Sequence, residues 1–142
     1  MKKTLLKLKP SPWIINQVEI VQKRKKINIL DFASGGGRHS INLASNRRVI
    51  TAIDKDRSKL ELYKNIKNIN PICFDLERND KWPLEKESFD VIIVSNYLYR
   101  PRIRELESFL KIGGFLFYET FAVGNEKYGK PSNPDYLLKH ME

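Results

Sequence analysis

Five short apolar runs alternate with segments of helical periodicity along this chain of 142 residues, and this alternation constrains the fold most strongly. The apolar runs, which we predict to be strands, are residues 27–32, 49–54, 70–75, 89–96 and 115–121. Helices are predicted over residues 12–24, 38–45, 56–67 and 101–110, and Gly113 and Gly114 are expected to end the last one. Strands that are apolar nearly throughout are typical of a parallel sheet with helices on both faces. The sequence therefore predicts a three-layer α/β fold.

Right-handed crossovers would give this sheet the strand order 3-2-1-4-5, which reverses between the first and fourth strands. In open α/β sheets, ligands bind beyond the carboxyl ends of the strands at such a reversal. The turn after residues 27–32 and the segment Ser95–Tyr99 are therefore expected to lie on opposite sides of one crevice.

The turn after the first predicted strand is rich in glycine, within the stretch ILDFASGGGRHS. Glycine permits a left-handed backbone and lets a ligand approach closely. A phosphate-binding P-loop is excluded, because Arg38 and His39 stand where that motif needs Lys and then Ser or Thr. A dinucleotide-binding fingerprint fits in part, since Gly35 and Gly37 match its first two glycines while Ser40 replaces the third.

The same turn resembles the first motif of the class I S-adenosylmethionine-dependent methyltransferases, in which an acidic residue precedes a G-x-G-x-G loop by two positions. Asp31, Ala33, Gly35 and Gly37 occupy the corresponding places, and Ala33 is the departure from the pattern. Alanine leaves room for a ligand but is disfavoured at positive φ. The resemblance implies the Rossmann-like fold of that family and S-adenosylmethionine as the cofactor.

Further motifs of this family follow in order along the chain. The resemblance implies that Asp54 accepts hydrogen bonds from the ribose hydroxyls and that Asp75 lies near the adenine amine. It also implies that Asn96 and Tyr97, with Ser95, lie beside the methyl group. The predicted cofactor-binding residues are Asp31, Ala33, Ser34, Gly35, Gly37, Asp54, Lys55, Asp75, Leu76, Asn96 and Tyr97. No metal site is expected.

Other roles for the three acidic residues stay open. Asp31 also suits a structural role, in which its carboxylate accepts hydrogen bonds from the amides of the loop. Asp54 also suits the start of a helix, and Asp75 also suits an ordinary turn.

Methyl transfer from a sulfonium is an in-line displacement, so alignment and the exclusion of water should supply most of the catalysis. A general base is needed only for an acceptor that carries a proton at the reacting atom. The candidates for such a base are Tyr97, Glu119, His39 and Tyr99. His39 is more readily interpreted as a solvent-facing or capping residue of a helix, and the two tyrosines also suit a crevice wall.

The net charge of +9 raises the question of a nucleic-acid partner, because a phosphate backbone attracts clustered Lys and Arg. The basic run KRKK occupies residues 23–26, and a looser group contains Arg100, Arg102 and Arg104. The looser group is interpreted as a solvated helix start, with acceptor binding as the alternative. One alternative function is therefore a basic RNA-associated module, and the methyl acceptor is not identified.

Residues 118–138 resemble the region after the fifth strand in small bacterial methyltransferases of the tellurite-resistance type. The class I family normally continues into a further helix and two antiparallel strands, whereas this sequence stops at Glu142. Strands 6 and 7 are therefore expected to be missing. Either the chain is a fragment, or its fifth strand is an exposed edge that the tail or a partner covers. A non-catalytic remnant that acts through a partner is a second alternative function.

We expect residues 1–142 to form a single domain, because the chain has enough apolar material for one core. It divides into an N-terminal helical part (1–26), a core of sheet and helices (27–121) and a loop with a tail (122–142). Within the last part, residues 122–136 read as a long loop, of the kind that serves as a lid.

The single cysteine, Cys73, excludes an internal disulfide and is interpreted as an inert core residue in a reducing cytosol. Lys7 and Lys9 interrupt the apolar start before it reaches the length of a secretion signal. No later stretch is long enough to span a membrane. The expected location is therefore cytoplasmic, without a membrane partner.

Overall fold

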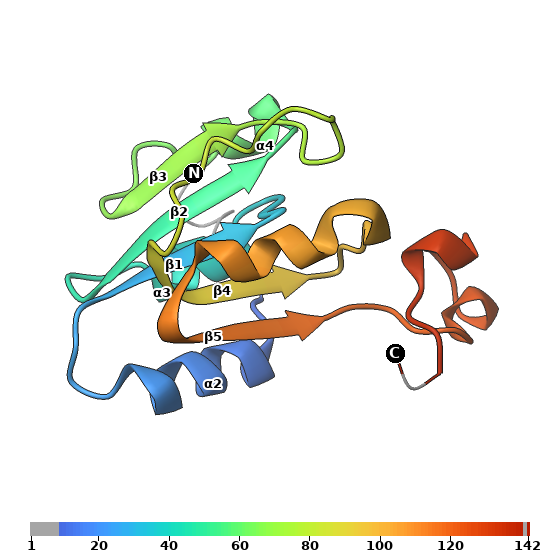
Figure 1. Cartoon of the computed structure of the whole chain (residues 1–142), viewed down its shortest axis with the longest axis horizontal. Coiled ribbons are helices and arrows are strands. Elements are labelled where there is room, and N and C mark those ends of the chain that lie inside the picture. Colours follow the sequence, from blue (N-terminus) through green and yellow to red (C-terminus); the bar gives the residue numbers. More distant parts are fainter. Residues whose placement is uncertain (1–8, 141) are drawn as a thin grey trace.

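The chain forms a five-stranded parallel sheet in a computed structural model that describes residues 9–140 and 142 (Figure 1). The strands are β1 (Ile27–Phe32), β2 (Arg48–Asp54), β3 (Ile69–Cys73), β4 (Phe89–Ser95) and β5 (Leu110–Glu119). Their spatial order is β3-β2-β1-β4-β5, and each neighbouring pair is parallel. The predicted order is confirmed, and it reverses between β1 and β4.

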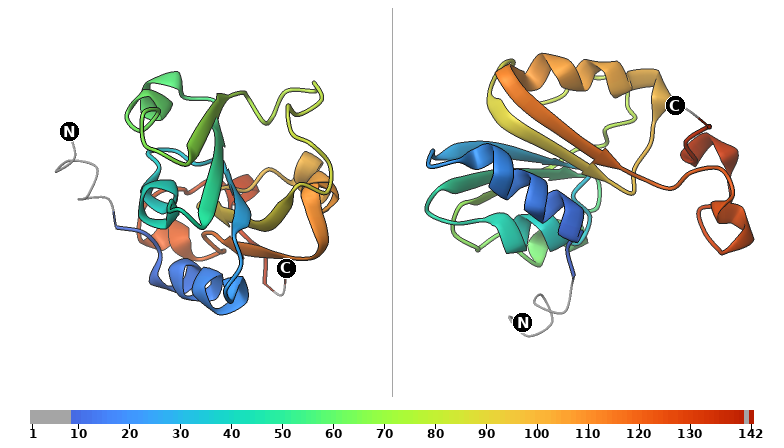
Figure 2. Two further views of the ribbon diagram at one scale, coloured as in Figure 1. Left: turned by 90° about the vertical axis from the view of Figure 1, so that its left-hand side faces the viewer. Right: turned by 90° about the horizontal axis from the view of Figure 1, so that it is seen from below.

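Helices cover both faces of this sheet. The elements are α2 (Pro12–Gln22), α3 (Arg38–Leu43), α4 (Arg57–Glu61) and the 3-10 helices η1 (Arg100–Phe109), η2 (Asn125–Lys127) and η3 (Pro134–Tyr136). Figure 2 shows α2, α3 and α4 on one face and η1 on the other. The side chains of β4 alternate accordingly, because Val91 and Ile93 pack in one core cluster while Ile92 and Val94 pack in the other. The three-layer α/β prediction is confirmed.

Two helix starts follow signals in the sequence. The side chain of Ser11 accepts a hydrogen bond from the amide of Ile14 at 3.3 Å. The carboxylate of Asp56 accepts hydrogen bonds from the amides of Ser58 at 3.0 Å and Lys59 at 3.3 Å. Although their starts lie within a residue of the prediction, α2, α3 and α4 all end earlier than their periodicity suggests.

The predicted helix over residues 101–110 is present to within a residue at each end, but the prediction that Gly113 and Gly114 end it is wrong. The segment is a 3-10 helix, and the next strand begins at Leu110 rather than at residue 115. Gly113 and Gly114 lie inside β5, where its register against β4 shifts. Gly113 has a φ of 82°, and a Cβ on Gly114 would lie 2.9 Å from a backbone carbonyl oxygen. The irregular strand therefore requires these glycines, which do not serve as a helix stop.

Cys73 is exposed, so the interpretation of this residue as part of the core is wrong. It is the last residue of β3, an edge strand in which Ile69 is the one buried residue. An apolar run at the edge of a sheet has fewer neighbours than one at the centre, which is why sequence pattern alone overestimates its burial.

The expectations for the start of the chain concern residues 1–8, which lie outside the described residues. Over residues 9–140 and 142, no helix is long and apolar enough to cross a membrane. The first described helix, α2, begins at Pro12 and packs against β5, where the rings of Trp13 and Phe117 meet edge to face at 5.9 Å.

The tail after β5 lies beyond the carboxyl ends of the strands (Figure 1). Ala122 and Leu138 form a parallel bridge within it. Arg100 of η1 donates hydrogen bonds to the carbonyl oxygens of Asp135 and Leu137. Of the two possible covers named for the edge of the fifth strand, the described part of the tail does not lie there, and Ile112 on β5 is 96% exposed.

Candidate functional site

The glycine turn follows β1 at the carboxyl end of the sheet, between the ends of β2 and β4. Three of its residues have a left-handed backbone, with φ of 58° at Ala33, 54° at Gly35 and 80° at Gly37. Glycine adopts this conformation freely, whereas at Ala33 it costs roughly 1 kcal/mol. The departure from glycine at position 33 is therefore accommodated with local strain.

Tyr63 supports the turn from the side of α4. Its hydroxyl donates a hydrogen bond to the carbonyl oxygen of Gly35 at 3.1 Å and lies 2.8 Å from the hydroxyl of Ser34. Its ring fills the space beside Gly37, where an added Cβ would lie 2.6 Å from a ring carbon. Burial raises the pKa of Tyr63, so the hydroxyl stays protonated and available as a donor. Sequence reasoning missed this residue, because it reads as one more apolar position of a helix.

Asp31 is buried at the end of β1 and accepts a hydrogen bond from the hydroxyl of Ser40 at 2.6 Å. Burial raises the pKa of Asp31 to about 6, although the hydrogen bond from Ser40 acts in the opposite direction. Ser40 occupies the place where a dinucleotide fingerprint needs glycine. Here its hydroxyl orients an acid instead of allowing closer packing of helix and strand.

His39 is buried, so its interpretation as a solvent-facing residue is wrong. Its Nε2 atom accepts a hydrogen bond from the amide of Ser11 at 3.0 Å, which joins α3 to the start of α2. Burial, together with the charge of Arg38, lowers the pKa of His39 to about 4. The lone pair on Nε2 of the neutral ring therefore accepts the hydrogen bond from Ser11, and Nε2 is not free to act as a base.

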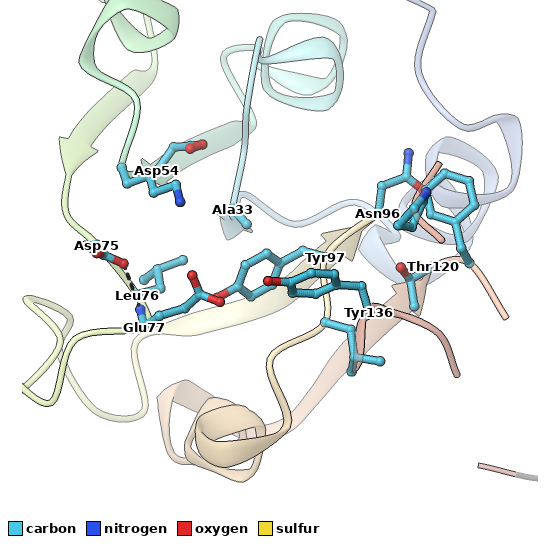
Figure 3. A pocket seen from close by; sticks show the side chains of 13 residues that line it. Ala33, Asp54, Asp75, Leu76, Glu77, Asn96, Tyr97, Thr120 and Tyr136 are labelled. Carbon is cyan, nitrogen blue, oxygen red and sulfur yellow. Dashed lines mark hydrogen bonds between the residues drawn. The ribbon is translucent and has the colours of Figure 1, made fainter. Parts of the chain in front are cut away.

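A cavity of about 410 Å³ opens at the carboxyl ends of the strands (Figure 3). Asp54, at the end of β2, faces it and also accepts a hydrogen bond from the amide of Gly35 at 3.2 Å. Asp75 lies on the same flank and accepts a hydrogen bond from the amide of Glu77 at 3.0 Å. The lining residues are Ala33, Asp54, Lys55, Asp75, Leu76, Glu77, Asn96, Tyr97, Leu98, Thr120, Phe121, Pro131 and Tyr136.

A second cavity, of about 230 Å³, adjoins the first and shares Ala33 and Asn96 with it. Its other lining residues are Asp31, Ser34, Gly35, Gly36, Arg38, His39 and Ser95. The two cavities together bring ten of the eleven predicted cofactor-binding residues to one edge of the sheet. Gly37 is the exception, because it packs against Tyr63 instead.

The remaining base candidates lie in different surroundings. Tyr97 lines the larger cavity with its ring 5.8 Å from that of Phe32, and burial raises the pKa of its phenol. Glu119 accepts a hydrogen bond from the hydroxyl of Ser95 at 3.4 Å. Tyr99 lines neither of these two cavities.

Six lining residues of the larger cavity were not predicted, namely Glu77, Leu98, Thr120, Phe121, Pro131 and Tyr136. Thr120 and Phe121 directly follow β5, so the rule that ligands bind at strand ends could have found them. Pro131 and Tyr136 come from residues 122–136, the loop interpreted above as a possible lid, although no sequence signal identified these two positions as lining residues. Among the described residues, no group of three or more His, Cys, Asp or Glu is placed to hold a metal ion.

Residues 29–114 match the family model described as a methyltransferase domain. The chain belongs to the methyltransferase domain family. The ubiquinone biosynthesis O-methyltransferase of Coxiella burnetii is 30% identical over a match that covers 80% of this chain and 53% of the relative. The chain therefore spans about half the length of the curated relatives it matches.

Solved structures support the fold of this methyltransferase domain. A SAM-dependent methyltransferase from Aquifex aeolicus superposes with a TM-score of 0.67 at 17% identity, over 96% of this chain and 80% of that one. The [4+2]-cyclase SpnF superposes with a TM-score of 0.58 at 19% identity, over 78% of this chain and 48% of that one. Because a cyclase shares the fold, the reaction of this member must be argued from its site.

Proposed function

We propose that this methyltransferase domain binds S-adenosylmethionine across the two adjoining cavities and transfers its methyl group. The observation that carries the proposal is the row of three carboxylates at the ends of β1, β2 and β3, namely Asp31, Asp54 and Asp75. These acids would attract the positively charged groups of the cofactor and accept hydrogen bonds from its hydroxyl and amine groups.

Each part of the cofactor has residues that suit it. The ribose diol would donate hydrogen bonds to Asp54, and adenine would lie against Leu76 with its amine near Asp75. The methionine portion would enter the smaller cavity, where Asp31 suits the ammonium group and Arg38 suits the carboxylate. The methyl group would then lie where the two cavities meet.

The proposed transfer needs little chemistry from the protein. A nucleophilic atom of the acceptor forms a bond to the methyl carbon while the carbon–sulfur bond breaks, and the electron pair of that bond neutralises the sulfonium. The proton of the acceptor, where it carries one, passes to a water molecule, which acts as the general base. The contribution of Asn96 and Tyr97 is to align the two reactants and exclude solvent, which is worth several orders of magnitude in rate.

Calorimetric titration with S-adenosylmethionine and S-adenosylhomocysteine tests this function. Asp54→Ala should weaken binding by about 1.5 to 3 kcal/mol, about 10-fold or more, because it removes a charged acceptor of two hydrogen bonds. Asp80→Ala is the matched control, since Asp80 is an exposed aspartate that does not line either cavity. Equal affinities of the wild type and the Asp54 variant would remove Asp54 from the site, and no binding by the folded wild type would refute the proposal.

The location, the partner and the subtype are also proposals. The exposed thiol of Cys73 suits a reducing compartment, which supports a cytoplasmic location. The basic run at residues 23–26 is exposed but precedes β1, so it lies at the end of the sheet opposite the cavities (Figure 1). RNA held by this run alone would contact the end of the sheet opposite the methyl group, which favours a small acceptor over RNA. The resemblance to the tellurite-resistance type stays a prediction.

A further inference from the structure

The larger cavity has two chemically different flanks. Figure 3 shows Asp54, Asp75 and Glu77 on one flank and Asn96 and Thr120 on the other. The acidic flank takes the adenosine part of the cofactor in the proposed function. The other flank comes from the ends of β4 and β5 and from the tail, and its lining residues are Asn96, Tyr97, Leu98, Thr120, Phe121, Pro131 and Tyr136. This part of the cavity lies away from the proposed adenosine site and faces the place where the methyl group would lie, so Asn96 and Tyr97 would contact both reactants there.

Among the described residues, the wall of this flank is aromatic and carries no positive charge. Tyr97, Phe121 and Tyr136 supply three rings, and Leu98 and Pro131 supply apolar surface. Ring faces of this kind bind planar aromatic molecules by stacking and edge-to-face contact.

The charge of the cavity restricts its ligand further. Of the described residues that line it, Lys55 alone is basic, against the three acids Asp54, Asp75 and Glu77. The cavity is therefore acidic in a chain whose net charge is +9. An anionic acceptor such as a phosphate ester would be repelled at close range.

Arg100 holds the outer part of this wall in place. Its guanidinium donates hydrogen bonds to the carbonyl oxygens of Asp135 at 2.9 Å and Leu137 at 2.7 Å. It also pairs with the carboxylate of Glu142 at 2.6 Å. Leu137 is buried, so Tyr136 sits between two anchored neighbours. Contacts within the fold therefore hold the outer part of the aromatic wall in position.

We propose that the aromatic flank is the acceptor subsite and that it takes a small aromatic molecule without negative charge. The proposal rests on the proposed function, because it assigns the part of the cavity that the cofactor leaves free. It excludes RNA and phosphorylated metabolites as acceptors at this site.

Three matched probes test the subsite on protein saturated with S-adenosylhomocysteine. Phenol has the ring and a hydroxyl, cyclohexanol has the hydroxyl without the π face, and phenyl phosphate has the ring with negative charge. Ligand-observed NMR titration should show that phenol binds at least about 3-fold more tightly than either of the others. Tyr136→Ala should weaken phenol binding by about the same factor and leave the affinity for S-adenosylhomocysteine unchanged. Tyr128→Ala is the control, because this tyrosine of the same tail is 89% exposed and lines no part of the cavity.

The outcomes separate this inference from the proposed function. Absence of S-adenosylhomocysteine binding would overturn both. Normal binding of S-adenosylhomocysteine would leave the function standing, and the acceptor subsite would then be refuted by any of three results. These are no phenol binding, equal binding of phenol and cyclohexanol or phenyl phosphate, and equal phenol binding by the wild type and the Tyr136 variant.

Discussion

Gly37 shows how one residue of the glycine turn serves the fold rather than the ligand. It has a φ of 80°, and the ring of Tyr63 occupies the space where a side chain would begin. Gly37→Ala should therefore lower the free energy of unfolding by about 2 to 4 kcal/mol, from backbone strain plus the displacement of a buried ring. Urea denaturation measures this loss.

Gly35→Ala is the matched comparison at the scale of a residue. Gly35 has a φ of 54°, but no atom of the residues that the structure describes lies within 4 Å of an added Cβ. Gly35→Ala should therefore lower the free energy of unfolding by about 1 kcal/mol, from the strain of the left-handed backbone alone. Equal losses at positions 35 and 37 would mean that the ring of Tyr63 moves aside freely and does not fix the turn.

Arg100 links two elements, η1 and the tail, and its contacts explain why the tail packs at the mouth of the cavity. Arg100→Gln should loosen the tail, because it removes the ion pair with Glu142 and disturbs the hydrogen bonds to the Asp135 and Leu137 carbonyls. We expect the amides of Val123 and Leu138, which bond across the tail, to exchange with solvent about 5-fold faster or more.

Arg104→Gln provides the control for this element. Arg104 lies on the same helix η1 and is exposed. Its substitution should leave the exchange of the tail amides unchanged. If both variants exchanged at the wild-type rate, the tail would be held by the burial of Leu137 rather than by Arg100.

The elements differ in how well the sequence predicts them. The stretch INILDF forms β1 with the predicted bounds, because a central strand is apolar on both faces and ends at a glycine turn. The acids Asp31, Asp54 and Asp75 were predicted from the resemblance to the class I methyltransferases, whose motifs lie at strand ends and are read without knowledge of side-chain packing. Tyr63 and Tyr136 were missed because their roles come from tertiary contacts, which local periodicity does not encode.

At the scale of the whole molecule, the distribution of charge separates two surfaces. The exposed basic run of residues 23–26 precedes the sheet, and the acidic cavity follows it. The net charge of +9 therefore describes the surface and not the site, so composition alone does not decide whether the protein binds nucleic acid. The substrate of a cavity depends on the charges that line it.

Two buried groups near the site should make opposite contributions to the pH dependence of stability. Asp31 has a pKa raised to about 6, so the folded state holds its proton more tightly than the unfolded state, and stability falls as pH rises from about 4 to 6. His39 has a pKa lowered to about 4, so the unfolded state holds the extra proton, and stability rises with pH between about 4 and 6.5. Each slope is about 1.4 kcal/mol per pH unit, and the two nearly cancel.

Substituting one of the two residues should reveal the pH dependence that the other contributes to the free energy of unfolding. In Asp31→Asn, only the titration of His39 remains of the two contributions. Urea denaturation of this cofactor-free variant should therefore give a free energy of unfolding that is higher at pH 6 than at pH 4.5 by about 2 kcal/mol. His39→Gln keeps an acceptor for the amide of Ser11. In this variant only the titration of Asp31 remains, so the free energy of unfolding should fall by a similar amount between pH 4.5 and pH 6. The wild type should stay nearly flat. Parallel pH profiles for all three proteins would show that the two groups do not titrate as a compensating pair.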